Sequence, residues 1–325
     1  KPYLPALVGY TVGTRGETAK FLFDFQRTVA ELFAENYYDY FAELCHREGI
    51  LAATEAYGGP FDSLRCFRTA DVPTGEFWLG ATPHGSPRVA ASAGHLNGRA
   101  QVGAESFTTE AMPGRWQITP RQLRESGDLG WLEGISQLVY HSYLSQPFMN
   151  VKPGLSLGRH GTQLNRHTTW WKDGNGWSQY VRRGQFLLQS GKSRADAIVL
   201  GGDSKPNAFN RPNAFVKAGY NFDFCGRDDL LRLEAKDGCV NMPGQEPYAF
   251  LCLGTDAYLT LPVLEKVKSL LAAGVKVAGR RPVDTPSLSD DPARWKRLVD
   301  EIWGGGKLNL VETDDPLKAV DAPVA

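Results

Sequence analysis

The stretch from residue 88 to 109, RVAASAGHLNGRAQVGAESFTT, constrains the fold more than any other part of the sequence. Its first half carries small residues and ends at Gly98, which is typical of a helix packed closely on a sheet and stopped by a glycine. The apolar run 101–104 predicts a buried parallel strand that ends on Glu105. Barrels of the α/β type place catalytic groups at such strand ends, although a glutamate there also commonly caps a turn or pairs with an arginine.

Strand-like and helix-like segments alternate over the first two hundred residues. A helix is predicted over 17–48, where large apolar residues recur every three or four positions. Three further short runs predict buried strands: 50–54, 135–141 and 193–200. Repetition of strand and helix gives a parallel sheet, and four strands are half of an eight-stranded barrel, so we expect at least one uncovered sheet edge.

Two segments of this region lack a helix or strand period. Residues 71–78 predict a long loop, and long ordered loops in compact domains are often functional. Residues 153–167, rich in Gly, Arg, His and Asn, predict an irregular segment that forms no packed element.

The last third of the chain has a different organisation. Residues 204–219 are rich in Pro and Asn and predict a linker, and Asp237-Gly238 predicts a hairpin. Strands are then predicted over 248–253, 275–279 and 308–311. Alternation with helices indicates a doubly wound, flavodoxin-like unit, and the absence of a GxGxxG motif argues against a nucleotide site. We therefore assign residues 1–205 to the C-terminal half of a (β/α)8 barrel and 206–325 to a flavodoxin-like α/β domain.

Composition excludes several classes of function. Thirty-six basic residues balance thirty-six acidic ones, so nothing indicates a nucleic-acid or anionic membrane partner. Five cysteines without a CxxC pair argue against a disulfide framework or a zinc ribbon, and Cys252 is interpreted as a buried structural residue. No run of 18 apolar residues predicts a membrane span. Eight tryptophans weakly favour a sugar ligand.

Other polar residues stand beside the predicted strands. Glu55 follows the run 50–54, and His141 ends the run 135–141. A histidine there can bond a sugar hydroxyl or orient a carboxylate, and bonding to a backbone carbonyl is just as common. Asp71 and Glu76 of the 71–78 segment are hard oxygen ligands if a cation is bound, and otherwise belong to a solvated loop.

Four segments resemble, in their order and spacing, the α-L-rhamnosidases of glycoside hydrolase family 106. They are EAYGG at 55–59, ASAGHLNGRAQVGAESFT at 91–108, YHSYLSQPF at 140–148 and GTQLNRHTTWW at 161–171. The similarity covers nearly the whole chain. It implies a (β/α)8 catalytic barrel followed by a doubly wound domain, and hydrolysis of terminal α-L-rhamnosyl residues with inversion.

The resemblance also implies roles for particular residues. Glu105 matches the family's general base, whereas the Asp-Ser-Trp-Glu type motif that carries the general acid does not occur in this sequence. We therefore expect this chain alone to be inactive without a missing N-terminal half of the barrel. Calcium is the expected cofactor, with Glu76 and Glu55 as the candidate ligands. The expected sugar-binding residues are Glu55, His95, His141, Arg166, Trp170 and Trp171.

Two alternatives remain open at this point. A retaining β-galactosidase-like enzyme would use two strand-end glutamates, for instance Glu55 and Glu105, about 5–5.5 Å apart. A non-catalytic carbohydrate-binding fragment would keep the pocket and lack the acid. In each case the expected partner is a rhamnose-containing oligosaccharide or another glycoside, with no nucleic acid and no membrane. The resemblance implies a periplasmic or extracellular bacterial location, while the chain itself begins at Lys1 with no secretion signal.

Overall fold

The computed structural model describes residues 2–80, 85–110, 116–158, 160–205, 207–305 and 309–320. The chain divides into two compact units. Residues 49–57 and 70–193 form one, named here the four-strand unit, and residues 1–48, 58–69 and 194–325 form the other, the five-strand unit. None of the described helices is both long and apolar enough to cross a membrane.

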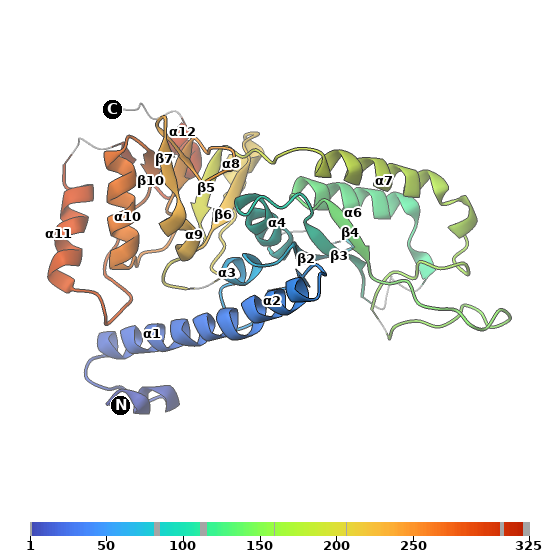
Figure 1. Cartoon of the computed structure of the whole chain (residues 1–325), viewed down its shortest axis with the longest axis horizontal. Coiled ribbons are helices and arrows are strands. Elements are labelled where there is room, and N and C mark those ends of the chain that lie inside the picture. The colour runs from blue at the N-terminus through green and yellow to red at the C-terminus, as the bar shows by residue number, and fades with distance from the viewer. Residues whose placement is uncertain are drawn as a thin grey trace. The chain divides into compact units, whose positions relative to one another are not determined.

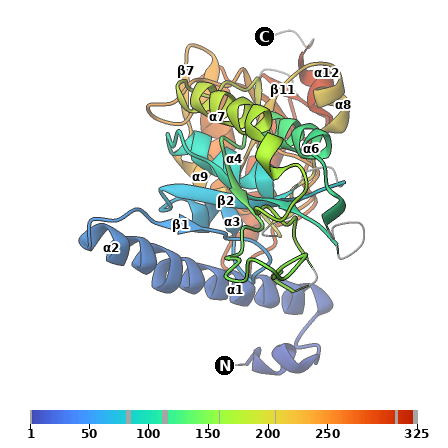
Figure 2. The ribbon, with the colours of Figure 1, turned by 90° about the vertical axis from the view of Figure 1, so that its right-hand side faces the viewer.

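The four-strand unit is built on a parallel sheet with helices along one face. Its strands follow one another in the order β1 (Ala53–Thr54), β2 (Val72–Trp78), β3 (Gly103–Thr108) and β4 (Gln137–Tyr140). Figures 1 and 2 show the covering helices on the same side of the sheet. They are α4 (Ser86–Leu96), α6 (Pro120–Leu132) and α7 (Asn175–Gln189), with the short 3-10 turn η3 (Trp171–Asp173) before α7. A parallel sheet of four strands is present, and three of its strands, β1, β3 and β4, overlap the predicted runs.

The prediction of a loop over 71–78 is wrong, because this segment is β2, which pairs with β1 and β3. Glycine and proline are normally depleted in strands, so Pro73 and Gly75 concealed it. The glycine is required by packing: a Cβ on Gly75 would lie 2.7 Å from backbone atoms of Ser86 and Pro87 at the start of α4. Because α4 approaches β2 so closely, position 75 must be glycine, and β2 lacks the apolar run by which a buried strand is recognised in sequence.

Helix α6 also packs closely on the sheet through glycines. It begins after Thr119, which forms a capping box with Gln122, and Pro120 occupies its first turn. Its Gly127 and Gly130 lie against Phe107 of β3 and Phe77 of β2. The sheet face that carries residues 75, 77 and 104 is thus covered by helices, and the opposite face carries residues 74, 76, 103 and 105.

The five-strand unit contains the second parallel sheet. Its order is β11-β10-β9-β5-β6, which in chain order is 5-4-3-1-2. The strands are β5 (Ala197–Leu200), β6 (Phe222–Cys225), β9 (Phe250–Cys252), β10 (Lys276–Ala278) and β11 (Leu310–Val311). The predicted Asp237-Gly238 hairpin joins the antiparallel pair β7 (Glu234–Lys236) and β8 (Cys239–Asn241). Cys252 is buried inside β9, as predicted.

The assignment of 193–200 to the barrel sheet is wrong, because β5 lies between β6 and β9 of the five-stranded sheet. All four residues of β5 are buried. A short, fully apolar run fits the centre of either parallel sheet, so the pattern alone could not choose between them. The chain passes between the two units at 48/49, 57/58, 69/70 and 193/194. The predicted single division at 205/206 is therefore wrong, because residues 1–48 and 58–69 also belong to the five-strand unit.

Helices of the five-strand unit include the long segment predicted over 17–48. It consists of α1 (Arg15–Phe33), the π-helical stretch η2 (Ala34–Asp39) and α2 (Tyr40–Arg47), and a capping box of Thr14 and Glu17 starts it. Much of its predicted apolar face is open, since Leu32 and Tyr37 are 53% and 61% exposed. The remaining helices are η1 (Leu4–Val8), α3 (Ser63–Phe67), α8 (Asn213–Lys217), α9 (Arg227–Arg232), α10 (Leu261–Ala272), α11 (Pro292–Trp303) and α12 (Pro316–Val320).

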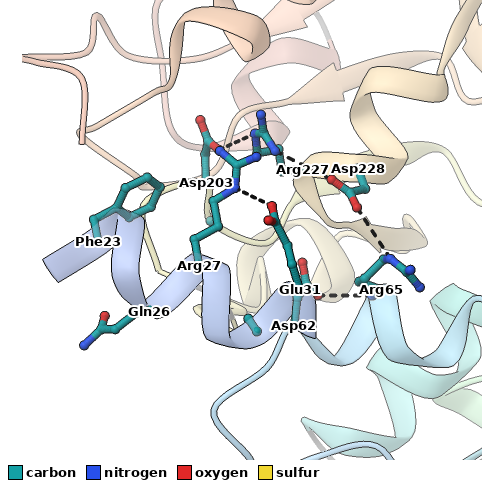
Figure 3. A pocket seen from close by; sticks show the side chains of 11 residues that line it. Phe23, Gln26, Arg27, Glu31, Asp62, Arg65, Asp203, Arg227 and Asp228 are labelled. Atoms are coloured by element: carbon teal, nitrogen blue, oxygen red, sulfur yellow. Dashed lines mark hydrogen bonds and ion pairs between the residues drawn. The ribbon is translucent and has the colours of Figure 1, made fainter. Parts of the chain in front are cut away.

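A cluster of charged side chains surrounds a small cavity of about 60 Å³ beside α1, in the five-strand unit (Figure 3). Asp203 follows β5, and its fully buried carboxylate accepts the backbone N–H of Thr260 at 2.5 Å and lies 3.6 Å from Arg227. Asp62 precedes α3 and caps that helix through Leu64 and Arg65. Burial raises the pKa of Asp203 and of Asp62 to about 6.

Candidate active site

Three glutamates gather on the face of the four-stranded sheet that is opposite the covering helices. Glu76 of β2 and Glu105 of β3 are partners in the parallel register, so their side chains leave the same face on neighbouring strands. Glu55 comes directly after β1, the strand next to β2. Glu55 and Glu105 therefore lie on nearby strands of one sheet, and Glu76 lies between them in strand order.

Glu105 sits inside its strand rather than at the end of it. The sequence predicted a strand that stops at Glu105, whereas β3 runs from Gly103 to Thr108 and Glu105 is its third residue. The polar residues after Glu105 hid the continuation, since an apolar run was the signal used. Glu105 is held by the hydroxyl of Thr108, which donates to Oε1 at 2.5 Å.

His141 approaches Glu105 from the next strand. It follows β4 immediately, and its backbone N–H donates to the carbonyl of Ser106 at 3.0 Å, which extends the pairing of β3 and β4. Its Nδ1 lies 3.9 Å from Glu105 Oε1 and has no hydrogen-bond partner among the described residues. His141 is thus brought to the carboxylates, at the carboxyl end of the sheet, as predicted from its place at a strand end.

The electrostatics of the cluster single out Glu55. Burial, followed by the neighbouring charges of Glu105 and Glu76, raises the pKa of Glu55 to about 7. The carboxyl group of Glu55 therefore holds its proton close to neutral pH. A protonated acid beside other carboxylates is the arrangement that proton-transfer chemistry requires.

Glu76 is bonded on both oxygens. Trp78, two residues along β2, donates its indole N–H to Oε1 at 2.6 Å, and the hydroxyl of Tyr57 donates to Oε2. Burial and the hydrogen bond to Glu76 raise the pKa of Tyr57, which keeps the phenol protonated. The Trp78 ring in turn meets His160 edge-on, with centroids 5.5 Å apart.

The contacts of Glu76 bear on the expected calcium site. Calcium takes roughly six to eight oxygen ligands. Among the described residues, no group of three or more His, Cys, Asp or Glu side chains is placed to hold a metal ion. Both oxygens of Glu76 already accept hydrogen bonds from Tyr57 and Trp78. The residues described here do not by themselves fit a calcium site, and no chemical step is derived through the ion.

His95 does not reach the glutamates. It lies in the last turn of α4, and its ring packs against Gly134, just before β4 begins. That is the amino end of the strands, opposite to the end where His141 lies. His95 and Glu105 are close in sequence, but His95 ends α4 at the amino end of the strands, whereas Glu105 lies further along β3.

Arg166, Trp170 and Trp171 were also expected to contact sugar. The guanidinium of Arg166 donates to the carbonyl of Gln146. The indole N–H of Trp170 donates to the carbonyl of Ile118 at 2.8 Å and its ring meets Trp177, while the Trp171 side chain is 38% exposed. These contacts are with residues other than the three glutamates, so a sugar-binding role for these residues stays a prediction.

Sequence reasoning missed the side chains that hold the carboxylates. Tyr57, Trp78 and Thr108 each donate a hydrogen bond to Glu76 or Glu105. Period-two alternation in 76–78 could have found Trp78, but only after 71–78 was recognised as a strand. The segment 161–165 is irregular, as predicted, yet all five of its residues are buried. The prediction that it does not pack was therefore wrong. Hydrogen bonds to Phe107 and Thr109 hold the segment in place of secondary structure.

A half-exposed cluster of carboxylates at the carboxyl edge of a parallel α/β sheet, with one acid protonated near neutrality, is the kind of site that glycosidases use. The comparison with known families agrees. The glycoside hydrolase 106 family, described as alpha-L-rhamnosidase, matches residues 1–319. This chain belongs to that family.

Individual relatives support the assignment over part of their length. A rhamnosidase structure from Novosphingobium sp. PP1Y matches 98% of this chain and 32% of its own, with 29% identity and a TM-score of 0.88. A curated protein of Formosa agariphila, named "Putative beta-glucuronidase", is 41% identical over 97% of this chain and 27% of its own length. A β-galactosidase structure from Rahnella sp. R3 shares only 12% identity at a TM-score of 0.52, which reflects the fold alone. The chain thus spans about a quarter to a third of its relatives.

Proposed function

We propose that this chain carries the base-bearing part of a glycoside hydrolase active site that releases terminal α-L-rhamnosyl residues with inversion of configuration. The observation that supports this most is the convergence of Glu55, Glu76 and Glu105 on one sheet face in a chain of the rhamnosidase family. An inverting enzyme needs one carboxylic acid and one carboxylate, roughly 6.5–9.5 Å apart, so that a water molecule fits between the base and the anomeric carbon.

Glu105 is the general base in this proposal. It is partly exposed and held on a rigid strand by Thr108, so it can accept a proton from the attacking water. His141 faces the same oxygen at 3.9 Å and can bond a sugar hydroxyl. The general acid belongs to a segment outside this chain, as the absent acid motif implies.

The architecture of the whole enzyme is part of the proposal. The four-strand unit is the C-terminal half of a (β/α)8 barrel, whose remaining strands pair with the open edges of β1 and β4. The five-strand unit is flavodoxin-like, which its strand order of 2-1-3-4-5 supports. The partners are therefore a rhamnosyl oligosaccharide or glycoside and the missing N-terminal half of the barrel, and calcium remains the proposed cofactor of the completed site.

One observation favours a second candidate, a retaining glycosidase with Glu55 and Glu105 as its carboxyl pair. Glu55 holds its proton near neutral pH because of burial and the charge of Glu105. Under this alternative Glu55 donates the proton to the leaving group and Glu105 attacks the anomeric carbon. A non-catalytic carbohydrate-binding role is the third alternative, since the acid motif is absent.

The test compares three aryl glycosides, an α-L-rhamnoside, a β-D-galactoside and a β-D-glucuronide, with the chain alone and with the chain supplemented by the N-terminal half of the barrel. An aryl leaving group needs little protonation, so we expect at most a trace of rhamnoside cleavage by the chain alone and restored cleavage after supplementation. Preferred turnover of the galactoside or the glucuronide would contradict the assignment of substrate. Binding of rhamnose without turnover in the supplemented protein would favour the non-catalytic alternative.

A further inference from the structure

Strand β3 changes its geometry two residues after Glu105. Phe107 has a φ of 68°, which is uncommon for a bulky residue that is not glycine. The register with β2 shifts at the same place, since Phe77 pairs with Ser106 and Trp78 pairs with Thr108. Phe107 is therefore an extra residue in β3, a β-bulge.

The bulge exchanges the faces on which the next side chains lie. In a regular strand residue 107 would share the face of Glu105, and residue 108 would point toward the helices. Instead the ring of Phe107 meets Phe77 with centroids 5.4 Å apart and lies against Gly127 of α6, on the covered face. The hydroxyl of Thr108 reaches Glu105 Oε1 at 2.5 Å on the other face.

Buried hydrogen bonds hold this conformation. The hydroxyl of Thr162 donates to the carbonyl of Phe107 at 2.7 Å, and the N–H of Leu79 donates to the carbonyl of Thr108 at 2.8 Å. Thr109 and Gly161 exchange two further bonds of 3.1 Å. A strained backbone of this kind persists only where its surroundings determine it, and such sites concentrate where function requires them.

We propose that the bulge makes Thr108 a positioning residue for Glu105, which rests on the proposed role of Glu105 as the base. The Thr108 hydroxyl fixes the carboxylate through Oε1, so that Oε2 is the oxygen that accepts the proton from water. The β-branch of threonine restricts χ1, and burial of 98% of the residue leaves it little room to turn. Thr108 touches neither the water nor the sugar in this account and acts only through Glu105.

The strand offers a matched control. Ser106 is two residues before Thr108 and is completely buried, but its hydroxyl donates to the carbonyl of Ala104 at 2.7 Å on the covered side of the sheet. Ser106→Ala therefore removes a buried hydroxyl from the same strand without touching the Glu105 carboxylate. A loss caused by general damage to β3 would appear in both variants, and a positioning effect would appear only at position 108.

The kinetic experiment measures kcat and KM for an aryl α-L-rhamnoside with the chain supplemented by the N-terminal half. Thr108→Val should lower kcat about tenfold or more with KM changed by less than about twofold, because a hydrogen bond to a charged group that acts in the transition state is lost. Thr108→Ser should restore kcat to within about threefold of the parent, and Ser106→Ala should leave kcat within about twofold. Equal losses in Thr108→Val and Ser106→Ala, or no rescue by serine, would overturn the proposal.

Crystal structures of Thr108→Val and Thr108→Ser decide the positioning claim independently of activity. The Glu105 carboxylate should turn away from its present orientation in the valine variant and keep it in the serine variant. An unmoved carboxylate in Thr108→Val overturns the inference even if rhamnosides are hydrolysed. Conversely, a moved carboxylate in a protein that cleaves no rhamnoside, or in which Glu105→Gln stays active, refutes the proposed function and not the role of Thr108.

Discussion

Each of the two units carries a set of carboxylates beside its parallel sheet, and the two sets are held in different ways. In the five-strand unit, Asp203 is buried and Asp62 is half-buried, and both accept backbone N–H groups. In the four-strand unit, Glu76 and Glu105 are partly exposed and accept hydrogen bonds from side-chain donors. A carboxylate bonded to buried backbone is committed to the fold, whereas one bonded to side chains at a surface can exchange partners with a ligand. The difference supports the proposed chemical role of Glu105 and a structural role for Asp203 and Asp62.

The largest expected effect is that of Glu105→Gln on hydrolysis. General base assistance is typically worth about 10²–10⁴-fold, so kcat/KM for an aryl α-L-rhamnoside should fall by that factor. The isosteric amide still accepts from Thr108, so the thermal midpoint should change little. Steady-state kinetics and a melting curve of the same preparation provide the comparison. Retention of parent-like kcat/KM would remove Glu105 from the mechanism.

Asp203→Asn tests whether the buried charge of Asp203 lowers the stability of the fold. The folded-state pKa of Asp203 is raised to about 6, so between about pH 4 and 6 the folded chain binds more protons than the unfolded chain, and the free energy of unfolding falls as the pH rises. A shift of about two pKa units corresponds to about 3 kcal/mol, an upper bound on the penalty above pH 6. The neutral amide should remove that penalty, so urea unfolding should show the variant to be more stable than the parent at pH 8.

Asp300 on α11 provides a control, because its pKa is shifted in the direction opposite to that of Asp203. The pKa of Asp300 is lowered by Lys296 and Arg281, so its stabilisation is present above its unfolded pKa and is lost as the pH falls. Asp300→Asn should therefore lower stability slightly at pH 8 and leave it unchanged in acid. If Asp203→Asn behaved like Asp300→Asn, the buried carboxylate would be a favourable ion-pair partner and the contrast between the two sheets would be weaker.

Gly75→Ala tests how the helix-covered face positions the glutamates on the other face. The added methyl would lie 2.7 Å from the backbone of Ser86 and Pro87, so α4 must move. Overpacking of this kind typically costs about 1–3 kcal/mol. Denaturant unfolding should show that loss, and activity should fall as well because Glu76 is the next residue of β2. Gly191→Ala, at an open position, should leave both measurements nearly unchanged.

The smallest expected effect concerns calcium. If the completed site binds the ion through Glu76, chelation should lower rhamnosidase activity, and Glu76→Gln should weaken the dependence on added calcium. Activity measured against free calcium concentration for parent and variant gives the result. Unchanged activity after exhaustive chelation would eliminate calcium, and the bonds from Tyr57 and Trp78 would then be the whole role of Glu76.

Period and composition predicted both sheets, the helix over 17–48 and the hairpin at Asp237-Gly238, because these elements are defined by local apolar spacing and turn residues. They failed for β2, whose Gly75 is dictated by contact with α4, and for β5, whose apolar run suits either sheet. Glu55, Glu105 and His141 were found from their places after apolar runs. Thr108 could not be found, since its contact with Glu105 depends on a bulge held by Thr162, 54 residues further along the chain.

The anomeric configuration of the first product tests the central claim most directly. Proton NMR of the supplemented protein acting on an aryl α-L-rhamnoside, recorded before mutarotation, distinguishes the two carboxylate mechanisms. With Glu105 as the base for an attacking water, β-L-rhamnose should appear first and the α-anomer should follow only as mutarotation proceeds. Initial release of α-L-rhamnose would contradict inversion and would make Glu55 and Glu105 the acid and nucleophile of a retaining enzyme.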